Sequence, residues 1–589
     1  LRFSRDGLGQ HTVGDDAGDG LVLHHRDLSP LGPAAQDRAM AAEIARAQRG
    51  LRPERRPLGR AVLFSLGPHR PDRLFVTVHH LVIDAVSWQV LLAELDRAHG
   101  QAASGTPVDL GPPPASFQDW AHRLAQYTAD GEFDPEAAYW SRTAGRVHAD
   151  LPRDLDGVAA PGDERAVTVR LGAAWTEALL RDVPQAYRTQ VNDVLLAALA
   201  HVLAHWSGRG QVAIALEGHG REARALGGGL DLSGALGWFT TLFPVVLEVP
   251  GTPGWGALLK SVKEQLRAVP RRGVGYGALR HLRPGTSGGQ PLPDHAEPPV
   301  SFNYLGRLTT SDASGTLFAR PPGRFELFGG DRGVRTRPLD VTALVADGQL
   351  EFTWHHSAAR HREETVRRLA EEVLEALRAI VRHCAGPNSG GATPSDFPLA
   401  GLEQAEVDRL VGDGRTVRDL LPLTPVQSGM LFHHLSAPDA GVYLEQVHLD
   451  VRGVPDPDAL ARAWQETVER TPELRAAVVW ADAGRPLLAV HRHCVLPLAH
   501  HDWRALSPAR QRERLRDLLA ADRAAPPALD RPPLMRLALV RLSGDRVRVV
   551  WTFHHVLLDG WSVFHVLSDV MAAHAALARG EAPRLPERR

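Results

Sequence analysis

The sequence predicts a mixed fold of the α/β or α+β class, from paired strand and helix patterns. Residues 74–78 and 547–553 are rich in β-branched and aromatic side chains, which indicates buried strands. Segments 84–98 and 559–577 follow them with the apolar spacing of helices, and each begins near an Asp that suits an N-cap. Strands and helices of this kind are mixed along the chain, so we assign it to this class.

Two further segments have clear helical patterns. Residues 192–206 (NDVLLAALAHVLAHW) are apolar on most sides, which predicts a buried helix. Residues 363–384 alternate polar and apolar side chains at helical spacing, and predict an amphipathic helix.

The first strand and helix belong to a long internal repeat. Residues 75–95 (FVTVHHLVIDAVSWQVLLAEL) and 550–570 (VWTFHHVLLDGWSVFHVLSDV) share an apolar run, a histidine pair, three apolar residues and an aspartate. A Pro-Leu pair lies 23 residues before His80, and another lies 22 residues before His555. The spacing of the copies is far longer than the period of a solenoid, so the repeat indicates one domain fold used twice.

The repeat predicts two domains joined by a short connection. We assign residues 1–384 to the first domain, with one lobe near 1–155 and a second near 156–384. Residues 398–589 form the second domain. Between them, residues 385–397 (AGPNSGGATPSDF) are rich in Gly, Pro, Ser and Thr, which is typical of a linker or exposed loop.

Alignment of the two copies predicts that neither is complete. Leu1 of the first copy corresponds to Leu474 of the second. The second copy carries another motif before that point, residues 421–427 (LPLTPVQ), and the first copy has no room for it. We therefore expect roughly 50 residues to precede Leu1 and the later half of the second domain to be missing from this chain.

The composition argues against several classes of protein. The formal net charge is −2 without a basic stripe, so nucleic-acid binding is not expected. No run of 18 apolar residues occurs and no signal-peptide pattern opens the chain, so we expect no membrane association. Cys384 and Cys494 stand far apart, which argues against a disulfide framework or a cysteine zinc site. These features suit the reducing cytoplasm.

The histidine pair is the main candidate for chemistry. At the end of a strand, His79 and His80 send their rings to opposite sides, so one ring can face a channel while the other packs inside. Histidine exchanges protons near neutral pH, and Asp84 can cap the following helix. From these residues alone, a purely structural hydrogen-bonded pair stays open. A metal site also stays open, although no third ligand stands at a suggestive spacing.

The full motifs resemble those of nonribosomal peptide synthetases. Residues 79–88 (HHLVIDAVSW) match the HHxxxDxxSW motif of epimerisation domains, and residues 554–560 (HHVLLDG) match the HHxxxDG motif of condensation domains. Residues 421–432 (LPLTPVQSGMLF) resemble the start of a condensation domain that follows an epimerisation domain. One departure is Thr471, which stands where the early condensation motif usually has His.

Further motifs of epimerisation domains follow in the expected order. They are residues 217–222 (EGHGRE), 237–240 (GWFT), 272–277 (RGVGYG) and 302–307 (FNYLGR). The resemblance covers essentially the whole chain, and several ordered motifs together are far more specific than any one of them.

The resemblance implies a fold, a substrate and partners. The fold is a pair of chloramphenicol-acetyltransferase-like lobes with a tunnel between them, in one nearly complete copy followed by the first lobe of a second. The substrate arrives on the phosphopantetheine arm of a peptidyl carrier domain, so this chain itself is expected to bind no cofactor. Upstream and downstream carrier domains and the adenylation domains of the same assembly line would be its partners. The product would be a peptide with a D-amino acid, such as an antibiotic or another secondary metabolite.

The resemblance also implies roles for residues of the first domain. His80 and Glu217 form the acid/base pair that inverts the Cα centre of the carrier-bound residue, and the order in which they act stays open. Asn303 and Tyr304 are candidates to polarise the thioester carbonyl or to stabilise an enolate. His79 and Asp84 support the loop, while Trp88, Trp238 and Phe239 are expected to pack rather than to act on substrate.

In the second domain, the resemblance assigns His555 to the condensation reaction. It would orient or deprotonate the amine of the acceptor aminoacyl group, with a D-residue peptide as donor. His554 and Asp559 would hold the loop around it.

Two alternatives remain beside the epimerase and condensation interpretation. One is a non-catalytic recruitment or scaffold module with the same fold, against which the intact His80, Glu217 and His555 argue. The other is a stand-alone acyltransferase that uses coenzyme A. The tandem repeat favours a piece of a carrier-fed assembly line over that alternative.

Overall fold

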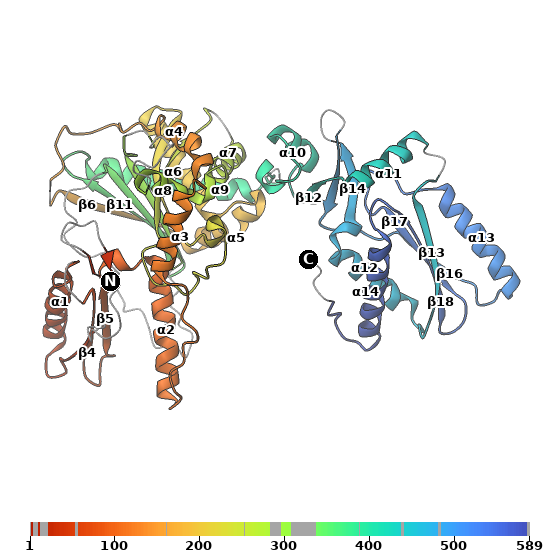
Figure 1. Cartoon of the computed structure of the whole chain (residues 1–589), viewed down its shortest axis with the longest axis horizontal. Coiled ribbons are helices and arrows are strands. Elements are labelled where there is room, and N and C mark those ends of the chain that lie inside the picture. The colour runs from red at the N-terminus through yellow and green to blue at the C-terminus, as the bar shows by residue number, and fades with distance from the viewer. Residues whose placement is uncertain are drawn as a thin grey trace. The chain divides into compact units, whose positions relative to one another are not determined.

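The chain forms two compact units in the computed structural model (Figure 1). The structure describes residues 2–3, 10–11, 22–53, 57–160, 162–251, 254–282, 292, 296–307, 337–387, 389–437, 441–480 and 485–585. Unit 1 comprises Leu1–Arg181, Val191–Pro253 and Ser261–Val381, and unit 2 comprises Asp182–Gln190, Gly254–Lys260 and Arg382–Arg589. Leu1, which the sequence aligns with Leu474, lies outside the described residues.

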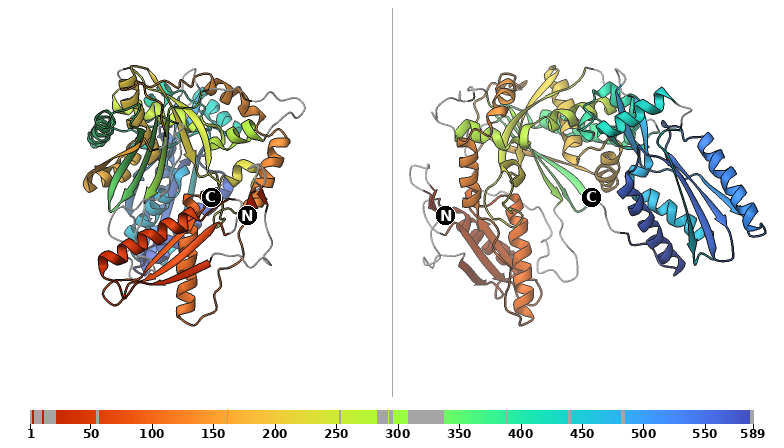
Figure 2. Two further views of the ribbon diagram at one scale, coloured as in Figure 1. Left: turned by 90° about the vertical axis from the view of Figure 1, so that its left-hand side faces the viewer. Right: turned by 45° about the vertical axis from the view of Figure 1, so that its right-hand side comes forward.

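Unit 1 begins with a small sheet covered by a helix. Its strands are β3 (Val22–Asp27), β4 (Gly59–Ser65) and β5 (Arg73–Val78), in the order β3-β4-β5. The first pair is parallel and the second antiparallel. Helix α1 (Pro33–Arg49) lies along the sheet (Figure 2). Its Met40 joins an apolar cluster with Val62 and Phe64. Helix α2 (Ala85–Ala103) follows, with Asp84 as its N-cap.

Unit 2 repeats this arrangement, as the sequence predicts. Its corresponding elements are β16 (Leu498–Asp502), α13 (Pro508–Ala524), β17 (Met535–Arg541), β18 (Arg546–His554) and α14 (Gly560–Ala578). The first two strands pair in parallel and the last two antiparallel, as in unit 1. Asp559 is the N-cap of α14. The two copies therefore share one topology over their common elements.

The two central strands differ in burial, which the sequence patterns do not distinguish. β18 is buried from Val549 to its end, whereas β5 is only partly buried and its Leu74 is 37% exposed. In unit 2, β13 (Leu444–Arg452) pairs with the second edge of β18, and α12 (Pro457–Arg470) packs against α14. Among the described residues of unit 1, no strand pairs with that edge of β5.

A six-stranded sheet dominates the rest of unit 1. It has the order β6-β11-β10-β9-β7-β8, and β9 runs parallel to both of its neighbours. The strands are β6 (Glu164–Leu171), β7 (Gln211–Gly218), β8 (Thr241–Glu248), β9 (Val300–Arg307), β10 (Leu339–Ala346) and β11 (Gln349–Ser357). Alternation along β10 buries Val341 and Ala343 on one face and leaves Asp340 and Thr342 half-buried on the other. One face is therefore core and the other is available to polar groups.

Helices supply the core side of this sheet. α6 (Val191–Ser207) is buried along nearly its whole length, and α9 (Glu363–Cys384) buries one apolar stripe, so both helix predictions are confirmed. On α5 (Ala173–Tyr187), the Thr176 hydroxyl accepts a hydrogen bond from the Leu350 amide of β11 at 3.0 Å.

The remaining elements complete the two units. Helices α3 (Phe117–Ala129), α4 (Ala137–Ala144), α7 (Trp255–Arg267) and α8 (Val274–His281) precede β9, and the backbone also forms the two-residue strands β1 (Arg2–Phe3) and β2 (Gln10–His11). Unit 2 adds α10 (Gln404–Val411), β12 (Val417–Pro422), α11 (Pro425–Ser436), β14 (Ala476–Trp480) and β15 (Pro486–His491). No helix among the described residues has the length and apolar character needed to cross a bilayer.

Within the predicted linker or exposed loop at 385–397, residues 389–397 are buried or partly buried. Ala392 and Phe397 are each 1% exposed and belong to an apolar cluster with residues of α10 and β15. Gly390 has a φ of 115°, and a Cβ there would lie 2.5 Å from the Asp413 carbonyl oxygen. Small residues are therefore needed here for close packing. Because glycine is common both in tightly packed turns and in flexible linkers, the composition of this segment does not distinguish the two.

Candidate functional site

The loop after β5 gives the two histidines of the first motif opposite hydrogen-bonding roles. The Leu81 amide donates to Nδ1 of His79 at 3.2 Å, so that nitrogen accepts and the neutral ring carries its proton on Nε2. Nδ1 of His80 lies 2.8 Å from the Ile83 carbonyl oxygen, which can only accept. Nδ1 of His80 must therefore carry a proton, and the lone pair of the neutral ring is on Nε2.

The second motif repeats this geometry in unit 2. The Val556 amide donates to Nδ1 of His554 at 3.2 Å, and Nδ1 of His555 lies 2.6 Å from the Leu558 carbonyl oxygen. The capping bond is also repeated, with the Ser562 amide 2.8 Å from a carboxylate oxygen of Asp559. The second histidine of each pair thus presents an unprotonated Nε2 when it is neutral.

The first histidine of the second motif is deeply buried. His554 is 1% exposed, and this burial, with smaller effects of His434 and His555, lowers its pKa to about 4. It is therefore a neutral packing residue at physiological pH.

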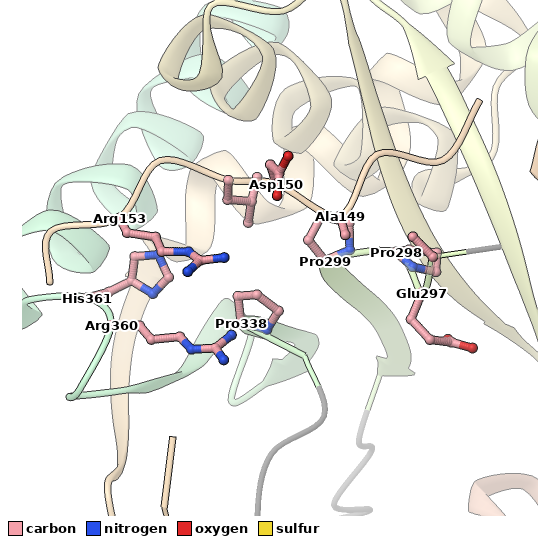
Figure 3. Close-up of a pocket in the computed structure, with 11 residues that line it drawn as sticks. Ala149, Asp150, Arg153, Glu297, Pro298, Pro299, Pro338, Arg360 and His361 are labelled. Carbon is pink, nitrogen blue, oxygen red and sulfur yellow. The ribbon is translucent and has the colours of Figure 1, made fainter. Parts of the chain in front are cut away.

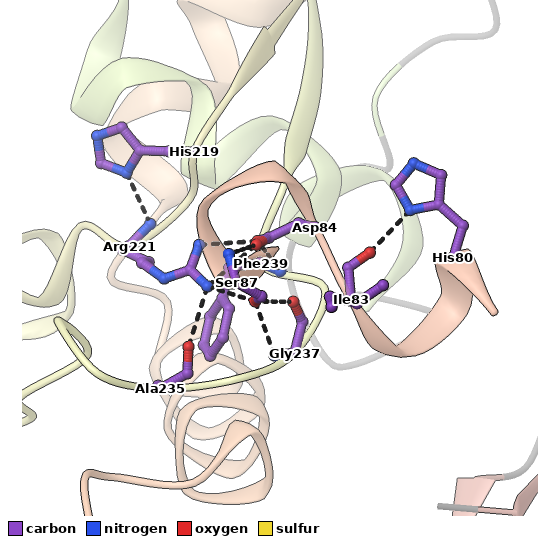
Figure 4. A network of polar contacts seen from close by, with 9 residues as sticks. All are labelled: His80, Ile83, Asp84, Ser87, His219, Arg221, Ala235, Gly237 and Phe239. Carbon is purple, nitrogen blue, oxygen red and sulfur yellow. Dashed lines mark hydrogen bonds and ion pairs between the residues drawn. The ribbon is translucent and has the colours of Figure 1, made fainter. Parts of the chain in front are cut away.

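An ion pair joins the first motif to the second lobe of unit 1 (Figure 4). Two nitrogens of the Arg221 guanidinium lie 2.8 and 3.1 Å from the two carboxylate oxygens of Asp84. Burial raises the pKa of Asp84, but hydrogen bonds from Arg221 and Ser87 outweigh it and lower the pKa overall. Asp84 is therefore a charged structural anchor as well as a helix cap.

Ser87 and Asp84 also fix the loop 237–239. The Ser87 hydroxyl donates to the Gly237 carbonyl at 2.9 Å and accepts from the Gly237 amide at 3.1 Å. The Phe239 amide donates to Asp84 at 3.1 Å, and the Phe239 ring is fully buried beneath the Arg221 guanidinium. Between them, Trp238 is 37% exposed and stacks on His80 with ring centroids 4.9 Å apart. Phe239 packs as expected, whereas Trp238 faces the candidate base.

Glu217 lies at the end of β7 and shares the polar face of the sheet with Asn303 of β9. The Asn303 amide donates to the Glu217 carboxylate. Glu217 is accessible to water, yet the surrounding protein removes part of its hydration, and this desolvation raises its pKa. Among smaller effects, His80 lowers the pKa and Asp340 raises it, so both lie within electrostatic range of the carboxyl.

Glycines let the segment after Glu217 pass close to its neighbours. Gly220 has a φ of 65°, and a Cβ there would lie 1.7 Å from the Phe239 carbonyl oxygen. A Cβ on Gly218 would lie 2.8 Å from Oγ1 of Thr241. The two glycines of the EGHGRE motif thus allow both Glu217 and Arg221 to reach the site from one short loop.

Tyr304 stands apart from this network. Its side chain is half-buried, and burial raises its pKa. Among the described residues, no hydrogen bond joins Tyr304 to Glu217 or Asn303.

A separate pocket of unit 1 lies near the first residues of β9 and β10 (Figure 3). Its walls include Arg153, Arg360 and His361, together with Pro299 and Pro338. None of the candidate residues lines it. No group of three or more His, Cys, Asp or Glu side chains suited to a metal ion occurs in the described part of the chain.

The family model described as Condensation domain matches residues 21–402 and 417–589. The chain belongs to the condensation domain family. Its fold is accordingly that of condensation and epimerization domains, which have chloramphenicol-acetyltransferase-like lobes. The family model matches the chain twice, and each match includes one of the two histidine motifs.

Relatives of this condensation-family chain belong to nonribosomal peptide synthetases. It is 39% identical over 98% of its length to a linear gramicidin synthase protein from Brevibacillus parabrevis, of which it covers 7%. It is 33% identical over 88% of its length to bacitracin synthase 3 from Bacillus licheniformis, of which it covers 8%. The chain spans less than a tenth of the length of these two relatives.

Among solved structures, the chain is similar to the epimerization domain from the third module of tyrocidine synthetase B. The identity is 32% and the TM-score 0.57, over 62% of this chain and 80% of that one. The resemblance seen in the motifs of the sequence is thus matched by similarity in three dimensions.

The sequence does not predict a role for three residues of the site, Arg221, Ser87 and Asp340. Arg221 and Ser87 stand inside recognised motifs, but their pairing with the Asp84 loop needs the fold. Asp340 stands in no motif, and only strand register, which sets it opposite Ser301 of β9, brings it near Glu217. The alternation of polar residues along β10 marks its half-buried face and is the only sequence hint of Asp340.

Proposed function

We propose that the first domain epimerises the C-terminal residue of a carrier-bound peptidyl or aminoacyl thioester from L to D. The observation that carries this proposal is the pair of His80 and Glu217, two groups that exchange protons and lie on separate elements within electrostatic range of each other. Inversion at Cα needs a proton removed from one face and another delivered to the opposite face. One acid and one base, each facing a different side of the substrate, meet this need.

The chemistry balances with these two groups alone. One group takes the Cα proton, the electron pair of the C–H bond moves into the enolate of the thioester, and the other group returns a proton to the opposite face. Neutral His80 offers the Nε2 lone pair as a base. Glu217 can hold the proton to be delivered, because desolvation raises its pKa. Reversal of the two roles serves the D-to-L direction.

Asn303 and Tyr304 are proposed to assist at the carbonyl. Asn303 orients the Glu217 carboxylate through one amide hydrogen. Its second amide hydrogen and the Tyr304 hydroxyl are the groups we propose to stabilise the enolate oxygen. Since burial raises the pKa of Tyr304, its hydroxyl keeps its proton and stays a donor at neutral pH.

We propose that the substrate is delivered on the phosphopantetheine arm of a carrier domain. The support is that the relatives are assembly-line proteins of which this chain covers a small share. In that setting, upstream and downstream carrier domains and adenylation domains are partners, and the chain binds no cofactor of its own. A cytoplasmic location is part of the same proposal.

The second domain is proposed to be the first lobe of a condensation domain that accepts the D-residue donor. The support is the match of residues 417–589 to the family and the repeated loop geometry around His555. Its Nε2 lone pair would orient or deprotonate the acceptor amine. Asp559 would hold the loop, as its hydrogen bond from Ser562 indicates.

Chiral analysis in the intact synthetase tests both assignments. The peptide released from the upstream carrier is hydrolysed, and the configuration of its last residue is measured beside product yield. His80→Ala should leave an L-residue and slow product formation, whereas His555→Ala should leave an L/D mixture on the carrier and no product. An L/D mixture formed at the normal rate by His80→Ala would exclude the epimerase role.

A further inference from the structure

The Trp238 ring lies against one face of the candidate base. The two ring centroids are 4.9 Å apart and the planes meet at 18°, which is a stacked arrangement. Trp238 remains 37% exposed. Trp238 is thus a partly exposed aromatic side chain whose ring is aligned with the imidazole of His80.

The two residues next to Trp238 in the sequence are hydrogen-bonded to the first turn of the helix that follows His80. Gly237 exchanges two hydrogen bonds with the Ser87 hydroxyl, and the Phe239 amide donates to Asp84. Asp84 and Ser87 belong to the first turn of α2. The backbone on either side of Trp238 is therefore fixed to the same element that positions His80.

A comparison within the loop separates positioning from packing. Phe239 is fully buried and contacts the rings of Phe117 and Trp120. Trp238 points the other way, toward His80, as alternate side chains of an extended segment do. Phe239 therefore anchors the loop, and Trp238 contacts His80.

We propose that Trp238 is a positioning residue for His80, an inference that rests on the proposed epimerase function. The stack with the indole and the hydrogen bond from Nδ1 to the Ile83 carbonyl together restrain the orientation of the His80 imidazole ring. When Nε2 takes the Cα proton, the indole face stabilises the positive charge that forms on the ring. Charged groups in this region include the Glu217 carboxylate, which interacts with His80, Asp340 and Arg337, which both act on Glu217, and the Asp84–Arg221 ion pair, which is neutral as a whole.

Nuclear magnetic resonance tests the stack without any activity. The chain is labelled with ¹³Cε1-histidine, and the His80 signal is assigned as the one lost in His80→Gln. Ring current from the indole should move the His80 proton signal upfield, and Trp238→Leu should return it downfield by several tenths of a part per million. Trp238→Phe should keep part of the upfield shift. No change in Trp238→Leu would contradict the stack itself.

The rate of epimerisation tests the consequence. In the intact synthetase, Trp238→Leu should reduce the initial rate of inversion about tenfold, the size expected for loss of an aromatic contact to a partly desolvated cation. Trp238→Phe should recover most of this rate, and the apparent KM for the carrier should stay unchanged. Trp480→Leu, at a comparably exposed tryptophan of unit 2, is the matched control and should leave inversion at the wild-type rate.

The outcomes separate this proposal from the proposed function. If wild type inverts no substrate, the epimerase function fails, while the spectroscopic test of the stack still stands. If wild type inverts substrate and Trp238→Leu does so at the same rate, the positioning role is wrong and the epimerase role is unaffected. A Trp238→Leu protein that raises KM and keeps kcat would also contradict the proposal, because it would place Trp238 in carrier binding.

Discussion

The Asp84 carboxylate and the Arg221 guanidinium form a two-point ion pair, with nitrogen–oxygen distances of 2.8 and 3.1 Å. Both side chains are almost fully buried, at 2% and 7% exposure. The pair ties the loop after β7 to the N-terminus of α2; Glu217 lies just before that loop, at the end of β7, and His80 lies just before that helix. The relative position of His80 and Glu217 therefore depends on this contact.

Loss of one partner of this ion pair should destabilise unit 1 strongly. Arg221→Met leaves the buried Asp84 charge without its cation, which typically costs about 3–5 kcal/mol. The change is measured by urea unfolding. Proteolysis of the unfolded protein then identifies the peptides that belong to unit 1. Arg367→Met removes a surface ion pair with Glu363 and should cost under about 1 kcal/mol. Equal effects of the two substitutions would contradict the structural role.

The contribution of Asp84 to the free energy of unfolding should be lost in acid. Its pKa is lowered in the folded state, so the stabilisation is present above the ordinary pKa near 3.8 and is lost as pH falls through the folded value. The stability difference between wild type and Asp84→Asn should therefore be large at pH 7 and should shrink progressively below pH 4. A difference that does not change between pH 7 and pH 3 would show that charge is not its source.

Glu217 should show the opposite dependence, because desolvation raises its pKa. A carboxyl of this kind favours the folded state only while it is protonated, so stability falls as pH rises from the unfolded value of 4.5 through the folded value. Glu217→Gln should therefore resist urea better than wild type at pH 8, with the gap closing near pH 4. Glu351→Gln, at a carboxylate on the same sheet, is the control. A variant less stable than wild type at pH 8 would mean that the carboxylate is a structural element.

His554 should make unit 2 sensitive to mild acid. Burial lowers its pKa from 6.5 to about 4, so the unfolded state binds a proton first, and stability is lost as pH falls from 6.5 toward 4. The loss should reach about 3 kcal/mol in urea unfolding of unit 2. His554→Gln should flatten this dependence, whereas His493→Gln, at a side chain that is 84% exposed, should leave it intact. A steep dependence that persists in His554→Gln would contradict this assignment.

The fold around both histidine pairs could be predicted from the sequence, because local rules decide it. The apolar runs, the capping Asp84 and Asp559 and the helical spacing after them all act within one strand and one helix. The burial of β5 and β18 could not be predicted, since it depends on whether another strand pairs beside them. Residues 385–397 were indistinguishable from a linker, because glycine serves both flexibility and close packing.

The candidate site divides in the same way. Motif order was enough to select His80, Glu217 and Asn303. The tautomers of His79 and His80 follow from hydrogen bonds to the backbone of single residues. A pattern of residue types cannot predict them. The stacking of Trp238 on His80 and the proximity of Asp340 to Glu217 depend on loop anchoring and strand register, which join segments far apart in the sequence.

Solvent-deuterium exchange in the intact synthetase tests the two-group account of epimerisation most directly. The upstream carrier is loaded with either the L- or the D-thioester in D₂O, and deuterium at Cα is measured before much inversion has occurred. If His80 and Glu217 serve opposite faces, His80→Ala should abolish exchange from one isomer and retain it from the other, and Glu217→Gln should show the reverse pattern. Exchange that disappears from both isomers in one variant and from neither in the other would contradict the account, since a single group would then handle both protons.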